Sequence, residues 1–227
     1  MPKLTIEEMI EQVPEGQART FEPSAEPGEE RYLKVSQNWD YNPGRLTWLN
    51  PLPLTASPWL GTREHPRISV STLPVPDVRY AGPADEVVDL YSTGSHAVFI
   101  SDKLFRLIEQ IDPGSLEHIE FQLYAEDGLL PFHAVMPSRV LEAVDTSRTT
   151  VRIQDETIGR RSFRKVRFPE GIVFDDDVLQ GVTSFSDLDV PGWYWSKDLI
   201  AEAKSHGIRG LIGGSPASVN LVTVVKL

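Results

Sequence analysis

Apolar and polar positions over residues 97–124 predict a strand, a helix and a second strand in succession. The apolar run that opens this stretch ends at Ser101, whose hydroxyl can accept a first-turn N–H and so cap a helix. The apolar residues that follow have the spacing of one helical stripe, and they are Leu104, Phe105, Ile108 and Ile111. Residues 112–114 contain the proline and glycine that end the helix, and the alternation over residues 121–124 predicts the exit strand.

Residues 193–212 repeat this order of strand, serine, helix and strand. The serine is Ser196, and Gly207 stands at the expected C′ position of the helix. The helical stripe consists of Leu199, Ile200 and Ala203. The two copies suggest a weak internal duplication of a strand–Ser–helix–strand unit. Such units are common in proteins, so duplication and chance similarity both account for the pattern.

Residues 1–30 differ in pattern from the rest of the chain. Thr5 and Glu8 form a capping-box motif, which predicts a short helix that ends near the following proline. Residues 14–30 are rich in Glu, Pro and Gly and have almost no apolar side chains, which is typical of a flexible linker. We therefore expect an acidic leader, dispensable for stability, followed by a single domain over residues 31–227.

Residues 31–95 combine frequent proline with large aromatic side chains. Eight of the eighteen prolines lie between residues 43 and 83. Three of the five tryptophans accompany them, namely Trp39, Trp48 and Trp59. Large aromatic side chains are typical of a packed core rather than of a disordered tail. The pattern predicts ordered coil with short edge strands, such as Leu46–Leu49 and Ile68–Val70.

Residues 96–227 contain most of the expected regular structure. Further strands are expected at residues 149–153, 160–167, 171–174 and 219–227. A helix is expected where Val140, Leu141 and Val144 have helical spacing, with Pro137 in its first turn. Few strand–helix–strand crossovers are present, so the pattern favours an α+β fold with mixed or antiparallel strands and a few helices.

The composition indicates a soluble cytoplasmic protein. About 40% of the 227 residues are apolar, which is enough for a substantial core. The chain has no cysteine, so disulfides and thiolate sites are excluded, in keeping with a reducing compartment. The N-terminus lacks a signal-peptide pattern, and no apolar run approaches the roughly 18 residues of a membrane helix.

The net charge of −11 is unevenly distributed along the chain. Residues 1–30 hold eight Glu against Lys3 and Arg19, so six of the eleven net negative charges lie in the leader. The remaining domain is only mildly acidic. This balance argues against general nucleic-acid binding, which requires a basic surface.

Candidate catalytic residues do not form a known motif. His118 and Glu120 resemble the H-x-E motif of zinc deaminases, but those enzymes also need cysteine ligands, which this chain lacks. The run Asp175–Asp177 lacks the alternate ligands and the Glu of an EF-hand loop. The residues therefore predict no cofactor and no metal site. An enzyme of unrecognised type using His118, His133 or Asp175–Asp177 stays one hypothesis, and a scaffold module is another.

Several segments between residues 95 and 212 follow one another in a recognisable order. They are FISDKLFRLIEQID, IEFQLY, FHAVMPSRVLEAVD, a basic strand containing FR, and YWSKDLIAEAKSHGIRGL. This order, with Ser101, Asp145, Ser196 and Gly207 at the shared positions, resembles the eleventh immunity protein family of bacterial polymorphic toxin systems, formerly a domain of unknown function. The resemblance implies a cytoplasmic protein that binds and neutralises a cognate toxin without catalysis.

The candidate partner-binding residues come from charge alone, because the resemblance supplies no contact residues. Residues 168–196 contain six acidic side chains and no Lys or Arg. The candidate contacts in this stretch are Asp175, Asp176, Asp177, Asp187 and Asp189. An acidic surface would speed encounter with a basic toxin. A solvated acidic loop without a partner is the alternative explanation.

Overall fold

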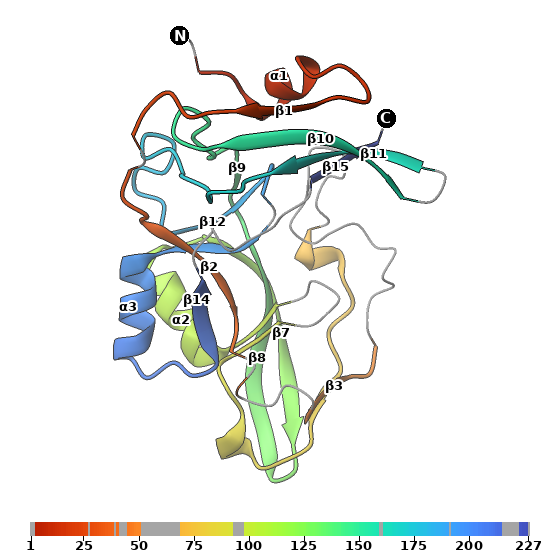
Figure 1. The fold of residues 1–227 in the computed structure, drawn as a ribbon. Coiled ribbons are helices and arrows are strands. Elements are labelled where there is room, and N and C mark those ends of the chain that lie inside the picture. The colour runs from red at the N-terminus through yellow and green to blue at the C-terminus, as the bar shows by residue number, and fades with distance from the viewer. Residues whose placement is uncertain are drawn as a thin grey trace.

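Pairing between strands organises the described part of the chain into sheets of four, five and six strands (Figure 1). The computed structural model describes residues 3–26, 28–38, 40, 45–50, 69–92, 98–158, 161–190, 192–214 and 223–226. Within these residues the strands are mixed and mostly antiparallel, and the helices lie outside the sheets. The fold is α+β, which confirms the predicted class.

The six-stranded sheet is built around one long antiparallel hairpin. Its strands are β3 (Leu46–Trp48), β4 (Val78–Tyr80), β5 (Leu90–Ser92), β6 (Val98–Ser101), β7 (Leu116–Ala125) and β8 (Gly128–Pro137). Their order across the sheet is β3-β4-β7-β8-β6-β5, and only β4 and β7 pair in parallel. The hairpin β7–β8 closes at the pair Ala125 and Gly128.

The five-stranded sheet has the order β14-β2-β13-β12-β9. Its strands are β2 (Tyr32–Gln37), β9 (Val140–Leu141), β12 (Ser184–Asp187), β13 (Tyr194–Ser196) and β14 (Leu211–Gly214). The four-stranded sheet has the order β1-β10-β11-β15 and lies toward the top of Figure 1. Its strands are β1 (Ala18–Phe21), β10 (Val151–Ile158), β11 (Arg161–Arg167) and β15 (Thr223–Lys226).

The helices begin where the sequence places their caps. They are α1 (Ile6–Glu11), α2 (Asp102–Ile111) and α3 (Lys197–Ser205). Thr5 and Glu8 make the reciprocal capping box of α1, while Ser101 and Ser196 accept first-turn N–H groups in α2 and α3. Gly207 follows the end of α3 with a positive φ of 65°, which glycine adopts without strain.

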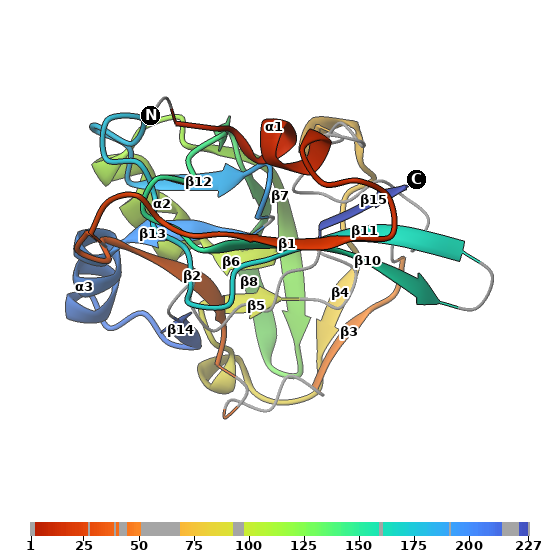
Figure 2. The ribbon, with the colours of Figure 1, turned by 45° about the horizontal axis from the view of Figure 1, so that its top comes forward.

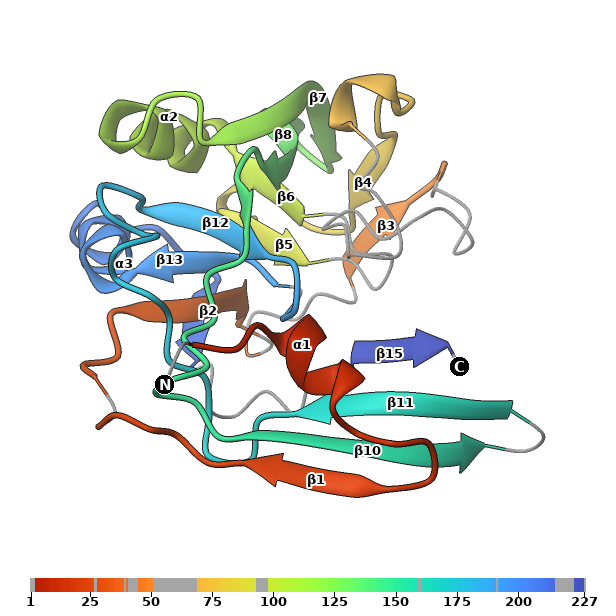
Figure 3. The same cartoon turned by 90° about the horizontal axis from the view of Figure 1, so that it is seen from above.

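The two predicted strand–Ser–helix–strand units have the same topology. In the first, β6 and β7 both pair antiparallel to β8, so α2 crosses between parallel strands that flank β8. In the second, β13 and β14 both pair antiparallel to β2, and α3 makes the equivalent crossover. The helices lie beside each other on one side of the molecule (Figure 3). The similarity therefore extends from local sequence to strand connection, in agreement with a duplication.

The apolar stripes of α2 and α3 pack in one core, as their spacing predicts. This cluster contains Leu104, Leu107, Ile108, Leu199, Ile200 and Ala203, together with Trp193 and Trp195. One detail of the predicted stripe is wrong, because Leu107 is buried while Ile111 is 37% exposed. Ile111 is the last residue of α2, so the helix ends before a neighbouring element covers this side chain.

The helix expected near Val140 is absent. Pro137 instead ends β8, where it pairs with Leu116, and residues 140–141 form the short strand β9 beside β12. The spacing of Val140, Leu141 and Val144 is compatible with either a helix or a strand. Residues 140–141 form a strand because they pair with Ser186 and Asp187. The strand expected at Gly171–Phe174 is reduced to a single bridge between Phe174 and Val144.

The Pro-rich stretch is described only in part. Val70 begins a 3-10 helix, Val70–Thr72, rather than ending the strand expected at Ile68–Val70, and Ile68 lies outside the described residues. Trp48 packs on Phe99 with a ring-centroid distance of 5.2 Å, in agreement with an ordered coil. The described part of the chain does not include the other two tryptophans of this stretch, Trp39 and Trp59.

The leader packs against the rest of the molecule. Figure 2 shows β1 along β10 and β11 in the four-stranded sheet, and Figure 3 shows α1 beside β11 and β15. The side chains of Ile6, Met9 and Val13 are buried in the core cluster between that sheet and the five-stranded sheet. The strand β1 pairs with β10, so the expected flexible linker over residues 14–30 is wrong for this part. The division of the chain at residue 30 stays a prediction.

Candidate functional site

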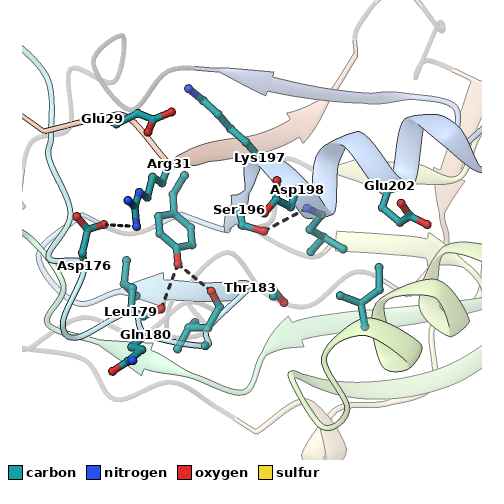
Figure 4. Close-up of a pocket in the computed structure, with 15 residues that line it drawn as sticks. Glu29, Arg31, Asp176, Leu179, Gln180, Thr183, Ser196, Lys197, Asp198 and Glu202 are labelled. Atoms are coloured by element: carbon teal, nitrogen blue, oxygen red, sulfur yellow. Dashed lines mark hydrogen bonds and ion pairs between the residues drawn. The ribbon is translucent and has the colours of Figure 1, made fainter.

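A groove of about 730 Å³ lies where α2 ends and α3 begins (Figure 4). Its walls come from three parts of the chain, namely residues 29–32, residues 176–183, and the first turns of α3. Ile111, at the end of α2, closes the remaining side. The volume falls within the roughly 300–1,000 Å³ that is typical of ligand sites.

The antiparallel arrangement of α2 and α3 produces this groove. Lys103, near the start of α2, donates a hydrogen bond over 3.2 Å to the carbonyl of Gly207, just after α3. The opposite ends of the helices therefore lie together, with Ile111 opposite Ser196. The Ser196 hydroxyl accepts the N–H of Leu199 at 3.1 Å, which fixes the first turn of α3.

Asp112 anchors the end of α2 behind the groove. Its carboxylate accepts hydrogen bonds from both terminal nitrogens of Arg139, at 2.6 and 2.7 Å, and from the Thr183 hydroxyl at 2.6 Å. Burial raises the pKa of Asp112, but the hydrogen bonds from Arg139 and Thr183 outweigh it and hold the pKa below its usual range. The ionised carboxylate thus joins α2 to Arg139, just before β9, and to Thr183 in the groove wall, just before β12.

Tyr32 fixes the opposite wall. Its hydroxyl donates a hydrogen bond to the carbonyl of Val182 at 2.8 Å and lies 3.2 Å from the carbonyl of Leu179. These contacts hold the turn at residues 179–182, where Gly181 has a positive φ of 73°. Burial, together with the nearby Asp176, raises the pKa of Tyr32, so the phenol stays neutral.

The charged lining of the groove is predominantly acidic. The carboxylates are Glu29, Asp176, Asp198 and Glu202, and the cations are Arg31 and Lys197. Figure 4 shows Arg31 facing Asp176 across 3.6 Å at one end, with Glu202 on α3 toward the other. Lys197 pairs with Glu30 at 3.9 Å. Among the described residues, no Lys, Arg or His forms an ion pair with Glu29 or Asp198.

Three of the five predicted partner-binding residues lie at or beside this groove. Asp176 lines it and also lies 3.7 Å from Arg148. Asp175 forms an ion pair with Lys3 at 2.6 Å and accepts the N–H of Asp177 at 3.0 Å, whereas Asp177 is exposed. The structure therefore brings Asp175–Asp177 together on one turn, with Asp176 directed toward the groove.

Asp187 and Asp189 do not share that surface. They are 0% and 5% exposed, respectively. Asp187 accepts the backbone N–H groups of Ala143, Asp189 and Val190 at 2.7–2.9 Å. Burial raises the pKa of Asp187 to about 7 despite these hydrogen bonds. The five carboxylates thus do not form one exposed patch, because Asp187 and Asp189 are buried.

The other candidate residues, His118 and His133, come together beneath α2. The ring of Phe105 stacks on His133 at 4.0 Å and lies 4.4 Å from His118. Nε2 of His133 is 3.2 Å from Asp102, but burial lowers the pKa of His133, so the ring packs as a neutral aromatic group. Among the described residues, no three His, Asp or Glu side chains gather as a metal site.

A second hollow of about 680 Å³ lies on the six-stranded sheet, near the tip of the β7–β8 hairpin. On this face of the sheet, Tyr124 of β7 lies between its cross-strand neighbours Arg79 of β4 and Leu129 of β8. Asp77 and Glu120 line the same hollow, and both are exposed. This surface has mixed charge and lies on the same face of the sheet as α2, beyond the part that the helix covers.

The groove residues Glu29, Asp198 and Ile111 were not among the site residues predicted from the sequence. No sequence pattern connects Glu29 with Asp198, because the two belong to segments that meet only through pairing of β2 with β13. The spacing of Ile111 matches that of the buried residues Leu104 and Ile108, so no sequence signal marked it as an exposed groove residue.

Comparisons with known proteins agree with the resemblance found in the sequence. A model of an immunity protein family (Imm11) matches residues 28–211 of the 227 residues. The matched span contains the first strand–Ser–helix–strand unit, the second unit as far as the start of β14, and all the residues that line the groove. A comparison with curated proteins found no match. Among the described residues, no helix is long and apolar enough to cross a membrane.

Proposed function

The chain belongs to the immunity protein family Imm11, and we propose that it binds and neutralises a cognate bacterial toxin domain in the cytoplasm. The family match over residues 28–211 is the observation that carries this proposal. The toxin is that of a polymorphic toxin system, and the chain acts on it by binding rather than by catalysis.

The candidate contact surface includes the groove between α2 and α3 and the turn Asp175–Asp177. Neutralisation requires tight binding, typically around nanomolar, which corresponds to about −12 kcal/mol. Such complexes bury roughly 1,600 Å² in total, so the groove must be one part of a larger interface. Asp187 and Asp189 are buried, so their side chains offer almost no surface to a partner.

Titration of toxin activity tests the proposed function. The probe is the toxin domain encoded beside the gene for this chain, which is produced separately and mixed with increasing amounts of the chain. Because binding without catalysis inhibits one toxin per chain, we expect activity to fall linearly to zero at a 1:1 ratio. Size-exclusion chromatography should then show a complex of the two proteins.

The same titration separates the competing hypotheses. Complete loss of toxin activity at far less than one chain per toxin would indicate an enzyme that modifies the toxin. In that case, replacement of His118, His133 or Asp175–Asp177 would identify the catalytic group. If the two proteins form no complex at micromolar concentrations and toxin activity is unchanged, the proposed function is wrong for this pair.

A further inference from the structure

We propose that the groove between α2 and α3 receives a lysine- or arginine-bearing segment of the toxin. This inference rests on the proposed function, and it names the part of the partner that this site recognises. The occupant follows from the charge, shape and rigidity of the groove.

The charge of the groove favours a cation. Its two basic side chains are already engaged, Arg31 with Asp176 and Lys197 with Glu30. Glu29 and Asp198 have no ion-pair partner among the described residues, and both are exposed. Carboxylates held in a hollow concentrate the negative field there, so an incoming Lys or Arg side chain meets complementary charge.

The shape of the groove suits long basic side chains. Ile111 and Val182 supply apolar surface between the acidic groups, and Ile111 is 37% exposed. Lys and Arg have aliphatic stems that pack on such surface while their charged ends reach polar groups. A volume of about 730 Å³ accommodates a few side chains of a protein segment rather than a single ion.

The groove is also formed before the partner arrives. Asp112 accepts hydrogen bonds from Arg139 and so holds the end of α2 that closes one side. Tyr32 donates to the carbonyl of Val182 and joins two of the walls, and Ser196 accepts the N–H of Leu199 in the third. Binding to a rigid site avoids the entropic cost of ordering it. The site can therefore contribute affinity from a small number of contacts.

A pair of charge-matched variants tests this inference. The groove variant combines Glu29→Gln with Asp198→Asn, and the control combines Asp77→Asn with Glu120→Gln in the other hollow. Both variants remove two negative charges from exposed positions, so long-range attraction to the toxin changes equally. We expect the groove variant to bind the toxin domain at least 10-fold more weakly, and the control to change less than 2-fold.

A third variant places a cation where the proposed segment would lie. Ile111→Lys should weaken binding at least as much as the double groove variant, because the introduced ammonium repels the incoming cation. Ile111 lies outside the buried stripe of α2, so thermal unfolding should change little. Unfolding curves of all variants verify that weaker binding does not come from loss of the fold.

The outcomes distinguish this inference from the proposed function. If the unaltered chain fails to bind the toxin domain, the proposed function fails first. If the unaltered chain binds and the groove variants bind equally well, the inference is overturned while the function stands. Equal weakening by groove and control variants would also overturn it, since total charge would then explain the effect.

Discussion

At the scale of single residues, Asp145 shows how one carboxylate joins distant parts of the chain. It accepts hydrogen bonds from the N–H and hydroxyl of Ser147 and from Nε of Arg148 at 2.6–3.0 Å. Lys3 of the leader lies 3.3 Å from the same carboxylate. Burial raises the pKa of Asp145, but the hydrogen bonds from Ser147 and Arg148 outweigh it and lower the pKa to about 2.

The lowered pKa of Asp145 predicts a loss of stability in acid. Since the folded pKa lies below the unfolded pKa, the stabilisation is complete above about pH 4 and is lost as pH falls toward 2. The contribution is about 2 kcal/mol. Urea unfolding of Asp145→Asn should show less dependence on pH in this window than the unaltered chain. Asp77→Asn, at an exposed position, serves as the control and should keep the full dependence.

The core positions of the paired helices predict large costs for truncation. Leu104→Ala and Leu199→Ala should each lower the free energy of unfolding by about 2–5 kcal/mol, because each opens a cavity in the shared core. Ile111→Ala, on the same helix as Leu104 but partly exposed, should cost much less. Losses below about 0.5 kcal/mol at Leu104 or Leu199 in urea would contradict the packing described above.

At the scale of elements, the two serine caps are alike in sequence but differ in their surroundings. Both hydroxyls accept a first-turn N–H, from Leu104 in α2 and from Leu199 in α3. Ser101 also donates to Asp89 at 2.6 Å, and Asp89 accepts the N–H of Arg209 at 2.7 Å. The cap of α2 is therefore linked through Asp89 to the segment that follows α3.

This difference predicts unequal effects of removing the two caps. Ser196→Ala should cost about 1 kcal/mol, the usual contribution of a cap. Ser101→Ala should cost about 2–3 kcal/mol, because it also deprives a buried carboxylate of a hydrogen bond. Chemical unfolding of both variants measures the difference. Equal losses would mean that the hydrogen bond to Asp89 adds no net stability.

At the scale of the whole molecule, the leader contributes buried side chains to a core that it shares with the remaining domain. Arg164 of β11 donates from Nη1 to the carbonyls of Ile10 and Val13, and it pairs with Asp155 of β10. Thr146 donates its hydroxyl hydrogen to the carbonyl of Leu4. These contacts lie on the four-stranded sheet and on the loop before β10, so they connect α1 with elements far along the chain.

Deletion of residues 1–30 should therefore destabilise the protein, contrary to the expectation from sequence alone. Ile6, Met9 and Val13 are buried, and each contributes about 1.5–3 kcal/mol. We expect the midpoint of thermal unfolding to fall by more than about 5 °C. Met9→Ala should reproduce part of this loss, whereas the exposed Glu11→Gln should not. An unchanged midpoint after deletion would show that the leader is an independent segment.

The sequence by itself determined the elements whose signals are local. The caps at Thr5, Ser101 and Ser196 and the apolar stripes behind them specify the three helices, because the residues involved are within one or two turns of each other. The α+β class also follows from the order of these elements. Short apolar runs such as Val140–Leu141 were ambiguous, because such a run occurs in both helices and strands and only a partner strand distinguishes the two.

Only the tertiary structure decided which carboxylates are exposed and where the groove lies. Asp187 and Asp176 look alike in the sequence, yet backbone N–H groups surround Asp187 while Asp176 lines the groove. Glu29 and Asp198 meet through the pairing of β2 with β13, and the leader is held by contacts with residues more than 100 positions away. Burial and proximity depend on long-range pairing, and no pattern within a short window of the chain contains that information.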